Sequence, residues 1–537
     1  MPPPAAARDG PTLAETAPAR PEAAPPRADG PAAAPHRRAV WRGLVAVLLA
    51  GVLVAALTVL MARADGASWR EAVRAASLPQ VHRLRVEGGM DSWGPMWSAL
   101  ARWREDPRRS PYAAALALDR CKFQYPPASW LLLELLPEPA GLPLACTADG
   151  PPDGHIHGAA WAAKPWLGRL SALACLALVG LSAAIAWRGL ARPRGAAAGM
   201  AAVAPTAAAT LSRPRSWTAP AGTVALALAL VAAGLGFYPL VKGHTLGQLQ
   251  VGLNLALALA LLALPAAPRT AGALVGLCGL LKPQYALFLL WGAWRRQHAF
   301  VAGAAAVLLA GHGLALARYG LQVHLDYLQL LQSLSRVGEA FWANQSLNGL
   351  LNRAWFPAEA AVWTPASFPP PHPVVRWGTL AGSVAVLAAA LWRPGPRHAP
   401  TAAAPVAAPV AAPPGAGPRL DFATMLAALT IASPIAWEHH YGAFLPLFAL
   451  LLALFATQPR WPARSALALA LAFVAMAHAV LRPDWFFEPS GQPWRGLLAS
   501  HLWFGALVVF GLLLHWRARL AGAVPAGAAA AVAGATR

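Results

Sequence analysis

The chain is a series of long apolar runs separated by short polar connections, most of which are rich in arginine. The runs are close to the ~20 residues that a helix needs to cross the hydrocarbon core of a bilayer. We therefore predict ten transmembrane helices. They are expected at 40–62, 165–187, 219–238, 248–266, 298–317, 376–393, 420–437, 441–457, 465–481 and 496–515.

One further apolar stretch, 270–294, is interrupted by Lys282, Pro283 and Gln284 and has arginine at both ends. Two half-length pieces that meet at a proline predict a hairpin of short helices or a broken re-entrant pair. With this hairpin included, we expect an all-α polytopic membrane protein with about 10–12 transmembrane helices.

The composition supports a membrane protein, because 57% of the 537 residues are hydrophobic and only 12% are charged. The mean hydropathy is +0.46. A soluble protein of this size could not hide so many apolar runs. We expect one membrane domain at 37–520, with a flexible cytosolic linker at 395–418 that is dense in Ala and Pro. Residues 1–36 and 521–537 are expected to be cytosolic tails, the first of them disordered.

The net charge is +21, from 43 Lys and Arg against 22 Asp and Glu. The basic residues lie mostly at the ends of apolar runs and form no groove with interleaved aromatics, so no nucleic-acid partner is expected. Loops rich in Lys and Arg stay on the cytosolic side of a membrane. This rule places both termini in the cytosol, and it places the loops 63–164, 318–375 and 482–495 and the corner 438–440 outside.

The four cysteines do not have the spacing of a metal site. Cys175 and Cys278 lie inside apolar runs and are expected to be small core residues. Cys121 and Cys146 lie in the first large loop, on the side where disulfides can form. The sequence leaves open whether these two are paired.

Asp91 is the first candidate for chemistry, in the loop 63–164 and followed by Trp93, Trp97 and Trp103. Aromatic side chains of this kind favour the membrane interface. A carboxylate held there can act as a general base, which typically contributes 10²–10⁴-fold to a rate. The alternative is a helix N-cap, because a helix is predicted at 95–104 and Asp is favoured at that position.

Three other polar residues border apolar segments. Tyr125 precedes the short apolar run 128–136, where it either faces a lipid-chain or sugar pocket or helps to anchor an interfacial helix. Gln248 begins a span and can either hydrogen-bond a sugar hydroxyl or support helix packing. Lys282 can pair with a lipid phosphate, or it can snorkel to the cytosolic surface. The predicted topology places Lys282 toward the cytosol unless the hairpin reaches through.

Two outer segments complete the candidate site. The amides of Asn344, Gln345 and Asn348 can contact sugar hydroxyls in the loop 318–375. Glu438, His439 and His440 form a corner between two apolar runs, and charge is expensive in the bilayer centre, so this corner belongs at the membrane edge. Paired histidines there can hold a phosphate, although a structural role at a helix end is the alternative.

These elements, in this order, resemble the polyprenyl-phosphate-mannose-dependent α-mannosyltransferases of glycosyltransferase family 87, which have the class C membrane glycosyltransferase fold. Each motif is weak alone, but the shared order and topology are fairly specific. The matching elements are Asp91 after the first span, Tyr112 followed by 123–127, Gly247 with Gln248, Lys282 with Pro283, 344–349 and 433–440.

The resemblance implies inverting transfer of a hexose, mannose in the family, from a polyprenyl-phosphate donor to an extracytoplasmic glycolipid or glycan acceptor. It implies that Asp91 deprotonates the acceptor, while His439 and His440 hold the donor phosphate with help from Lys282 and Tyr125. No nucleotide, metal or other cofactor is expected, because the leaving group is a lipid phosphate that nearby cations can stabilise. The expected location is the plasma membrane, with the active site on the outer face. The residues expected to contact the sugar or the acceptor are Gln248, Asn344, Gln345, Asn348 and Glu438.

Two other classes of protein fit parts of the pattern. A secondary transporter or lipid flippase usually shows inverted repeats and charges deep in its spans, and neither is evident here apart from Lys282. A non-catalytic scaffold needs no polar cavity. An enzyme instead requires Asp91 and His439 to face one cavity.

Overall fold

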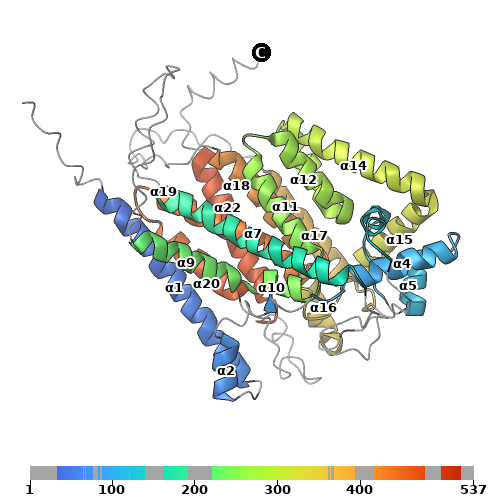
Figure 1. The fold of residues 1–537 in the computed structure, drawn as a ribbon, viewed down its shortest axis with the longest axis horizontal. Coiled ribbons are helices and arrows are strands. Elements are labelled where there is room, and N and C mark those ends of the chain that lie inside the picture. The colour runs from blue at the N-terminus through green and yellow to red at the C-terminus, as the bar shows by residue number, and fades with distance from the viewer. Residues whose placement is uncertain are drawn as a thin grey trace, which may run out of the picture.

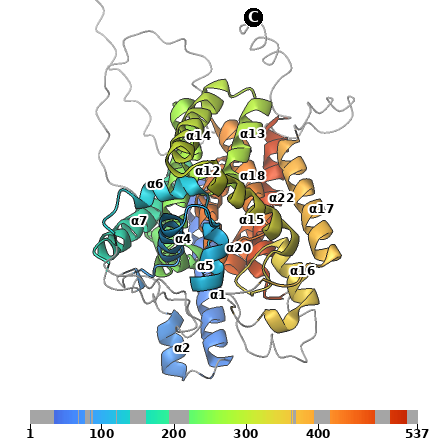
Figure 2. The ribbon, with the colours of Figure 1, turned by 90° about the vertical axis from the view of Figure 1, so that its right-hand side faces the viewer.

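The computed structural model is a bundle of membrane-length helices with a smaller helical cap at one end (Figure 1). Among the residues that the structure describes, the only β-type contact is an isolated bridge between Asn344 and Trp437. Helices α7 and α17 lie on opposite flanks of the bundle (Figure 2). The described residues are 33–64, 66, 68–76, 83–84, 88–119, 121–138, 161–191, 221–360, 363, 368–392, 415–477 and 498–521.

Each of the ten predicted spans falls on a helix, which confirms an all-α polytopic membrane protein. By length and composition, six helices in the described part can cross a membrane, or seven if α9 and α10, bent by 48°, form one span. Helices α11, α12 and α20 are apolar but shorter. The helices on the predicted spans are α1 (Ala33–Ala64), α7 (Lys164–Ala191), α9 (Ala221–Leu235), α10 (Tyr238–Thr245), α11 (Gln250–Ala263), α14 (His298–Tyr319), α17 (Pro373–Leu391), α18 (Ala416–Ile431), α19 (Leu445–Thr457), α20 (Ala463–Ala477) and α22 (His501–Ala521).

Several of the predicted boundaries shift. Helix α1 begins at Ala33, inside the predicted tail, and α18 begins at Ala416, inside the predicted linker. Helix α18 also ends at Ile431, earlier than predicted, because Pro434 cannot continue a helical hydrogen-bond ladder. The remaining parts of the predicted tails and linker, 1–32, 395–414 and 522–537, lie outside the described residues.

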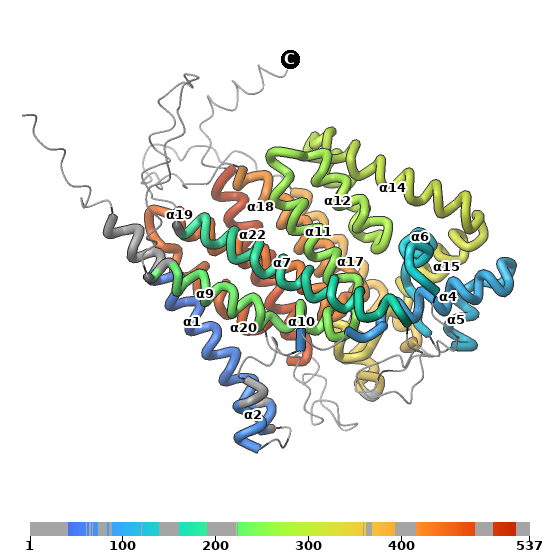
Figure 3. The backbone as a smooth tube through the Cα atoms, viewed as in Figure 1, coloured from blue at the N-terminus to red at the C-terminus, as the bar shows by residue number. Residues whose placement is uncertain are grey.

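The interrupted stretch forms the predicted hairpin of short pieces. Helix α12 (Pro268–Leu281) is followed by the 3₁₀ turn η2 (Pro283–Leu287) and by α13 (Phe288–Trp294). Lys282 adopts an extended conformation at the break, with φ −139° and ψ 102°. Helix α12 packs along α14, and the two run side by side in Figure 3.

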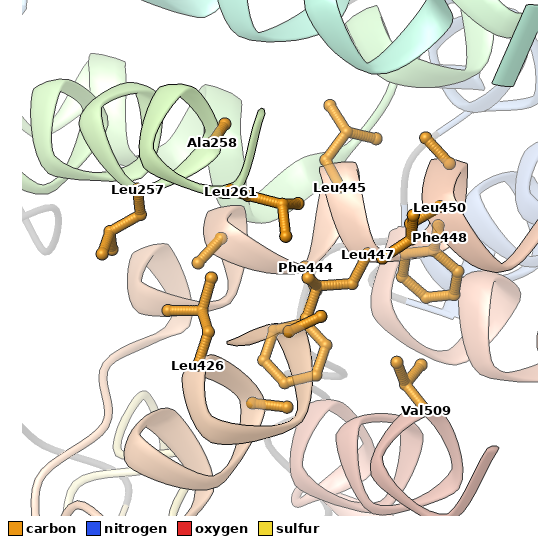
Figure 4. Packing of buried hydrophobic residues seen from close by; sticks show 14 of the residues in the cluster. Leu257, Ala258, Leu261, Leu426, Phe444, Leu445, Leu447, Phe448, Leu450 and Val509 are labelled. Carbon is orange, nitrogen blue, oxygen red and sulfur yellow. The ribbon is translucent and has the colours of Figure 1, made fainter. Parts of the chain in front are cut away.

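The centre of the bundle is α19, a helix that is buried on all its faces. Its side chains meet residues of α11, α18 and α22 in a continuous apolar core, as Figure 4 shows for Leu447 and its neighbours. Helix α7 approaches α19 closely, since a Cβ at Gly189 would lie 2.4 Å from the Cβ of Ala453. Small residues at such contacts allow membrane helices to pack tightly without a hydrophobic driving force.

A second core, rich in aromatic rings, joins the first large loop to α14 and α15. Phe123 stacks on Tyr112 at 5.1 Å and on Trp130 at 6.0 Å, and Trp130 meets Tyr319 edge-on at 5.2 Å. Cys121, at the start of this segment, is disulfide-bonded, whereas Cys146 lies outside the described residues. Figure 1 shows α4 and α5 beside α15, far from α1 and α2. The elements outside the predicted spans are α2 (Trp69–Ala76), α4 (Trp93–Glu105), α5 (Pro111–Asp119), η1 (Pro127–Ser129), α6 (Trp130–Leu133), α15 (Leu321–Val337), α16 (Leu347–Trp355), η3 (Pro357–Glu359) and η4 (Glu438–Phe444).

The helix ends that the charge pattern places on one side do meet. Asp421, near the start of α18, accepts hydrogen bonds from Arg295 after α13, at 2.9 Å, and from Arg517 of α22, also at 2.9 Å. Arg517 also donates to the Ala390 carbonyl at the end of α17, at 2.6 Å. Cations at the last carbonyls of a helix satisfy groups that have no partner within the helix. The ends of α13, α17 and α22 and the start of α18 therefore lie on one face of the bundle.

Candidate active site

A cavity of about 500 Å³ opens between the cap, the hairpin and the 433–441 corner. Seven of the ten predicted site residues line it, although they come from segments far apart in the chain. Asp91 and the two corner histidines therefore face the same space, as an enzyme requires. The seven residues are Asp91, Tyr125, Gln248, Lys282, Glu438, His439 and His440.

Asp91 is held by a small polar network rather than placed at a helix start. Gln248 donates from Nε2 to the Asp91 carboxylate. Ser92 donates to Gln248 Oε1 at 2.8 Å, and its hydroxyl also lies 2.8 Å from the Tyr125 hydroxyl. The N-cap alternative is wrong for Asp91, because α4 begins at Trp93 and the cap position belongs to Ser92. The network fixes the carboxylate at the cavity wall.

Backbone pairing brings these residues together. Gly89 N–H donates to the Thr245 carbonyl at 2.9 Å, and Asp91 N–H donates to the Leu246 carbonyl at 3.0 Å. At Gly247 the chain adopts φ +70°, and a Cβ there would lie 1.7 Å from the Gly89 carbonyl oxygen. Only glycine combines this conformation with so close an approach. The Gly247-Gln248 pair therefore presses the α10–α11 turn against the Asp91 segment.

Replacing Gly247 by Ala should lower transfer activity by about 100-fold while leaving the helical content unchanged. The added methyl forces the 88–91 segment away from the turn, and small misplacements of a catalytic group cost about this much. Gly252→Ala is the matched control, because a Cβ at Gly252 meets nothing within 4 Å. Circular dichroism and initial rates measure both variants. Equal activity of the two variants would contradict the role given to this contact.

The basic side of the cavity contains Lys282 and the histidine pair. Lys282 Nζ lies 2.5 Å from His440 Nε2, and both side chains are buried. His439 is 3% exposed, and its Nε2 has no hydrogen-bond partner among the described residues. A buried polar atom without a partner is costly, so a ligand that supplies one is stabilised there. A phosphate oxygen is such a ligand.

Lys282 follows the end of α12 that is remote from Arg269, as expected if the hairpin reaches through. Lys282 lies on the cavity wall, and its charge interacts with Asp91. The physical reason is the length of α12, whose 14 residues rise about 21 Å from the Arg269 end of the hairpin. The extended break of the hairpin therefore delivers the lysine to the same cavity as Asp91.

Lys242 joins this basic group, although the sequence did not single it out. It is half-buried at the cavity wall, and its side chain makes no hydrogen bond with a described residue. Its charge acts on both Glu438 and His439. Glu438 itself accepts a hydrogen bond from the Tyr238 hydroxyl at 2.8 Å. The acid at the corner is thus engaged with α10, and Lys242 adds a third basic centre beside the histidines.

Asn344, Gln345 and Asn348 do not line the cavity. Asn344 accepts a hydrogen bond from Ala436 N–H at 3.0 Å, and Gln345 donates to the Ala499 carbonyl at 2.6 Å. Asn348 accepts from Glu339 N–H at 3.1 Å. The structure uses these amides to join loops, because buried amides need partners for both donor and acceptor. The described contacts of Asn344 and Gln345 include the corner segment, those of Asn348 do not, and none of the three residues lines the cavity.

Lysine content is a signal that could have identified more of the site. The chain has four lysines, and three of them, Lys122, Lys242 and Lys282, line this cavity. In a protein whose other basic residues are all arginine, these few lysines are therefore candidates for a functional role. The aromatic residues Trp363 and Trp437 also line the cavity. Ordinary interface tryptophans have the same sequence pattern, so these two carried no distinguishing signal.

A comparison with models of protein families finds a match. Residues 196–413 match the model of glycosyltransferase family 87. No curated protein and no solved structure matches the chain. The matched residues contain Lys242, the Gly247-Gln248 pair and Lys282, while Asp91 and the histidine pair lie outside them. Residues 196–413 are therefore similar to glycosyltransferase family 87, and they belong to a chain whose apolar helices are those of a multi-pass membrane protein.

Proposed function

We propose that the enzyme transfers a hexose, with mannose as the first candidate, from a polyprenyl-phosphate donor to a glycolipid or glycan acceptor. The observation that carries this proposal is one cavity that combines a fixed carboxylate with a group of basic side chains. Asp91 and Lys282 are close enough to interact electrostatically, and the Lys282 Nζ lies 5.9 Å from the centre of the Tyr125 ring. A single sugar can contact both groups.

In the proposed reaction, Asp91 accepts the proton of an acceptor hydroxyl as that oxygen attacks the anomeric carbon of the donor. The bond between the anomeric carbon and the phosphate oxygen breaks, and the electron pair leaves with the polyprenyl phosphate. Lys282, His439 and Lys242 stabilise the charge that develops on this phosphate, as preorganised donors do in other transfer reactions. The proposal needs no nucleotide or metal, because side chains of the protein can balance the charge of the leaving group.

An apolar wall supports a lipid-linked donor. Leucines from the hairpin, α15, α17 and α18 line the same cavity as the basic group. Such a wall suits an isoprenoid chain, which binds by burial of apolar surface at about 25 cal/mol per Å². A free nucleotide sugar has no apolar chain that could bury this wall. The leucines are Leu281, Leu287, Leu331, Leu334, Leu387 and Leu429.

Inversion follows from a single displacement with one carboxylate. Retention by double displacement requires a second positioned carboxylate as the nucleophile. Glu438 is the other acidic residue of the described cavity lining, and its hydrogen bond with Tyr238 ties it to α10. Asp91 acting alone as a base is therefore the simpler proposal.

A packed core beneath the cavity favours an enzyme over a transporter. Phe288 of the hairpin stacks on Phe422 of α18 with centroids 4.5 Å apart, and Trp291 packs edge-on against both rings. The Arg295–Asp421 ion pair lies beyond them. A translocation path would have to open this layer of rings and then break the ion pair.

The arginine-rich face supports an extracytoplasmic active site in the plasma membrane. Arg295 and Arg517 gather at one set of helix ends, whereas Lys282 and the corner lie at the opposite end of their segments. Basic residues near span ends prefer the cytosol. The cavity would then open toward the outer leaflet, where a flipped polyprenyl-phosphate sugar presents its head group.

Sealed membrane vesicles test both the reaction and the face. Vesicles that contain the enzyme and labelled polyprenyl-phosphate mannose receive an impermeant acceptor, methyl α-mannobioside. Right-side-out vesicles should label it, with the anomeric configuration opposite to that of the donor, and inside-out vesicles should not. A product from labelled nucleotide sugar without the lipid donor, or a retained configuration, would refute the donor or the mechanism respectively.

A further inference from the structure

Beyond Asp91, the cavity wall continues along the extended segment 121–126. Lys122, Gln124 and Tyr125 line the cavity, whereas Phe123 between them is buried in the aromatic core of the cap. Tyr125 belongs to the hydrogen-bond network that holds Asp91. The segment therefore leads along the cavity wall from the network of the proposed base to Lys122.

Lys122 holds an aromatic platform at the far end of this segment. Its Nζ forms an ion pair with Glu339 at 2.7 Å, and both side chains are almost fully buried. The same Nζ lies 4.2 Å from the ring centroid of Trp363 and 4.4 Å from that of Phe368. Cation–π contacts of this kind are strongest when the cation is desolvated. The ion pair and the two rings fix Trp363 at the cavity wall.

Trp363 is part of a cluster of rings that stays half-exposed to the cavity. Its ring lies 5.3 Å from that of Trp437 and 5.6 Å from that of Phe341, centroid to centroid, and all three line the cavity. Gln124 is also half-buried there and makes no hydrogen bond with any described residue. Apolar ring faces beside an unsatisfied amide suit a ligand that has both an apolar face and hydroxyl groups.

We propose that Lys122, Gln124, Trp363 and Trp437 form a subsite for a second sugar of the acceptor, next to the sugar whose hydroxyl faces Asp91. This proposal rests on the proposed function. A hexose has an apolar face of C–H groups that can lie on Trp363 and an edge of hydroxyls that Gln124 can contact. A polyprenyl-phosphate monosaccharide carries only one sugar, so the subsite serves the acceptor. The acceptor is therefore a glycan of at least two hexoses rather than a lipid alcohol or a single sugar.

Binding without donor tests the subsite apart from catalysis. Equilibrium dialysis measures labelled methyl mono- and dihexosides of the manno, gluco and galacto series against the full-length protein in nanodiscs. In at least one series, the dihexoside should bind about 10-fold more tightly than the monohexoside, which is typical of one added aromatic contact. Trp363→Leu should abolish this difference. Trp363→Phe should keep most of it, and Gln124→Ala should reduce it several-fold.

Trp377→Leu is the matched control, because Trp377 is a tryptophan of α17 that is 58% exposed and outside the cavity lining. It should leave both affinities unchanged. The proposal is overturned if no dihexoside binds more tightly than its monohexoside, or if the difference survives in Trp363→Leu. If the difference depends on Trp363 but no sugar is transferred from polyprenyl-phosphate mannose, the subsite stands and the proposed donor fails.

Discussion

Replacing Asp91 by Asn should lower the rate of the chemical step by about 10²–10⁴-fold, because the amide cannot accept the acceptor's proton. Asparagine has the same shape and can still pair with Gln248, which holds the carboxylate in the native protein. Donor binding should therefore change by less than about twofold. Single-turnover transfer from labelled polyprenyl-phosphate mannose, together with direct donor binding, separates the two effects.

The matched control for this substitution is Asp106→Asn. Asp106 is an exposed residue after α4 whose carboxylate accepts a hydrogen bond from Arg108 N–H at 3.0 Å, outside the cavity lining. The Asp106→Asn variant should transfer sugar at the native rate. Full activity in Asp91→Asn would remove the general base from the proposed mechanism. A loss of donor binding equal to the loss of rate would make Asp91 a binding residue instead.

Removing the phosphate contacts should weaken donor binding rather than acceptor binding. Each of His439→Ala and Lys282→Met should raise the donor Kd by about 10- to 100-fold, the effect of losing one hydrogen bond to a charged group. Lys282→Met keeps the length of the side chain and removes its charge. In the double variant Lys282→Met with His440→Ala, the loss of donor-binding free energy should be smaller than the summed losses of Lys282→Met alone and His440→Ala alone. The reason is that the Lys282 and His440 side chains contact each other.

Two substitutions at distant sites serve as controls for the basic group. His298 is exposed at the start of α14, and Lys164 begins α7, and neither lines the cavity. His298→Ala and Lys164→Met should bind donor with native affinity. Isothermal titration with a short-chain polyprenyl phosphate, which lacks the sugar, isolates the phosphate contact. Equal losses of donor and acceptor affinity in His439→Ala would contradict a phosphate site.

The membrane fold could be predicted because apolar length is a local property of the chain. Runs near 20 residues can bury their backbone groups only as helices in lipid, so each predicted span became a helix. The meeting of Arg295 with Asp421 and Arg517 also agrees with the charge pattern, since charge asymmetry is set loop by loop. The ends of α18, at Ala416 and Ile431, differ from the predicted ones, and the early end at Ile431 follows from Pro434.

The candidate site also has a part that the sequence could predict and a part that it could not. Asp91 and the corner could be proposed because charged residues at the edge of apolar runs are costly unless they have a role. Asn344 and Gln345 have a polarity that suggested ligand contacts, yet the structure uses their amides to tie loops together. A sequence shows that an amide needs partners but does not show whether a backbone group or a ligand supplies them.

By itself, the sequence determined that this protein is a polytopic helical membrane protein, that its arginines gather at the ends of the apolar runs, and which polar residues are exceptional. Only the tertiary structure decided that Lys282 lines the same cavity as Asp91, that Gly247 presses the two loops together, and that Lys122 contacts the Trp363 ring at the cavity wall. The physical reason is the distance over which each effect acts along the chain. Hydrophobicity and charge act through each residue's own contact with lipid or water, whereas a site depends on distances between segments that are set by how the helices pack.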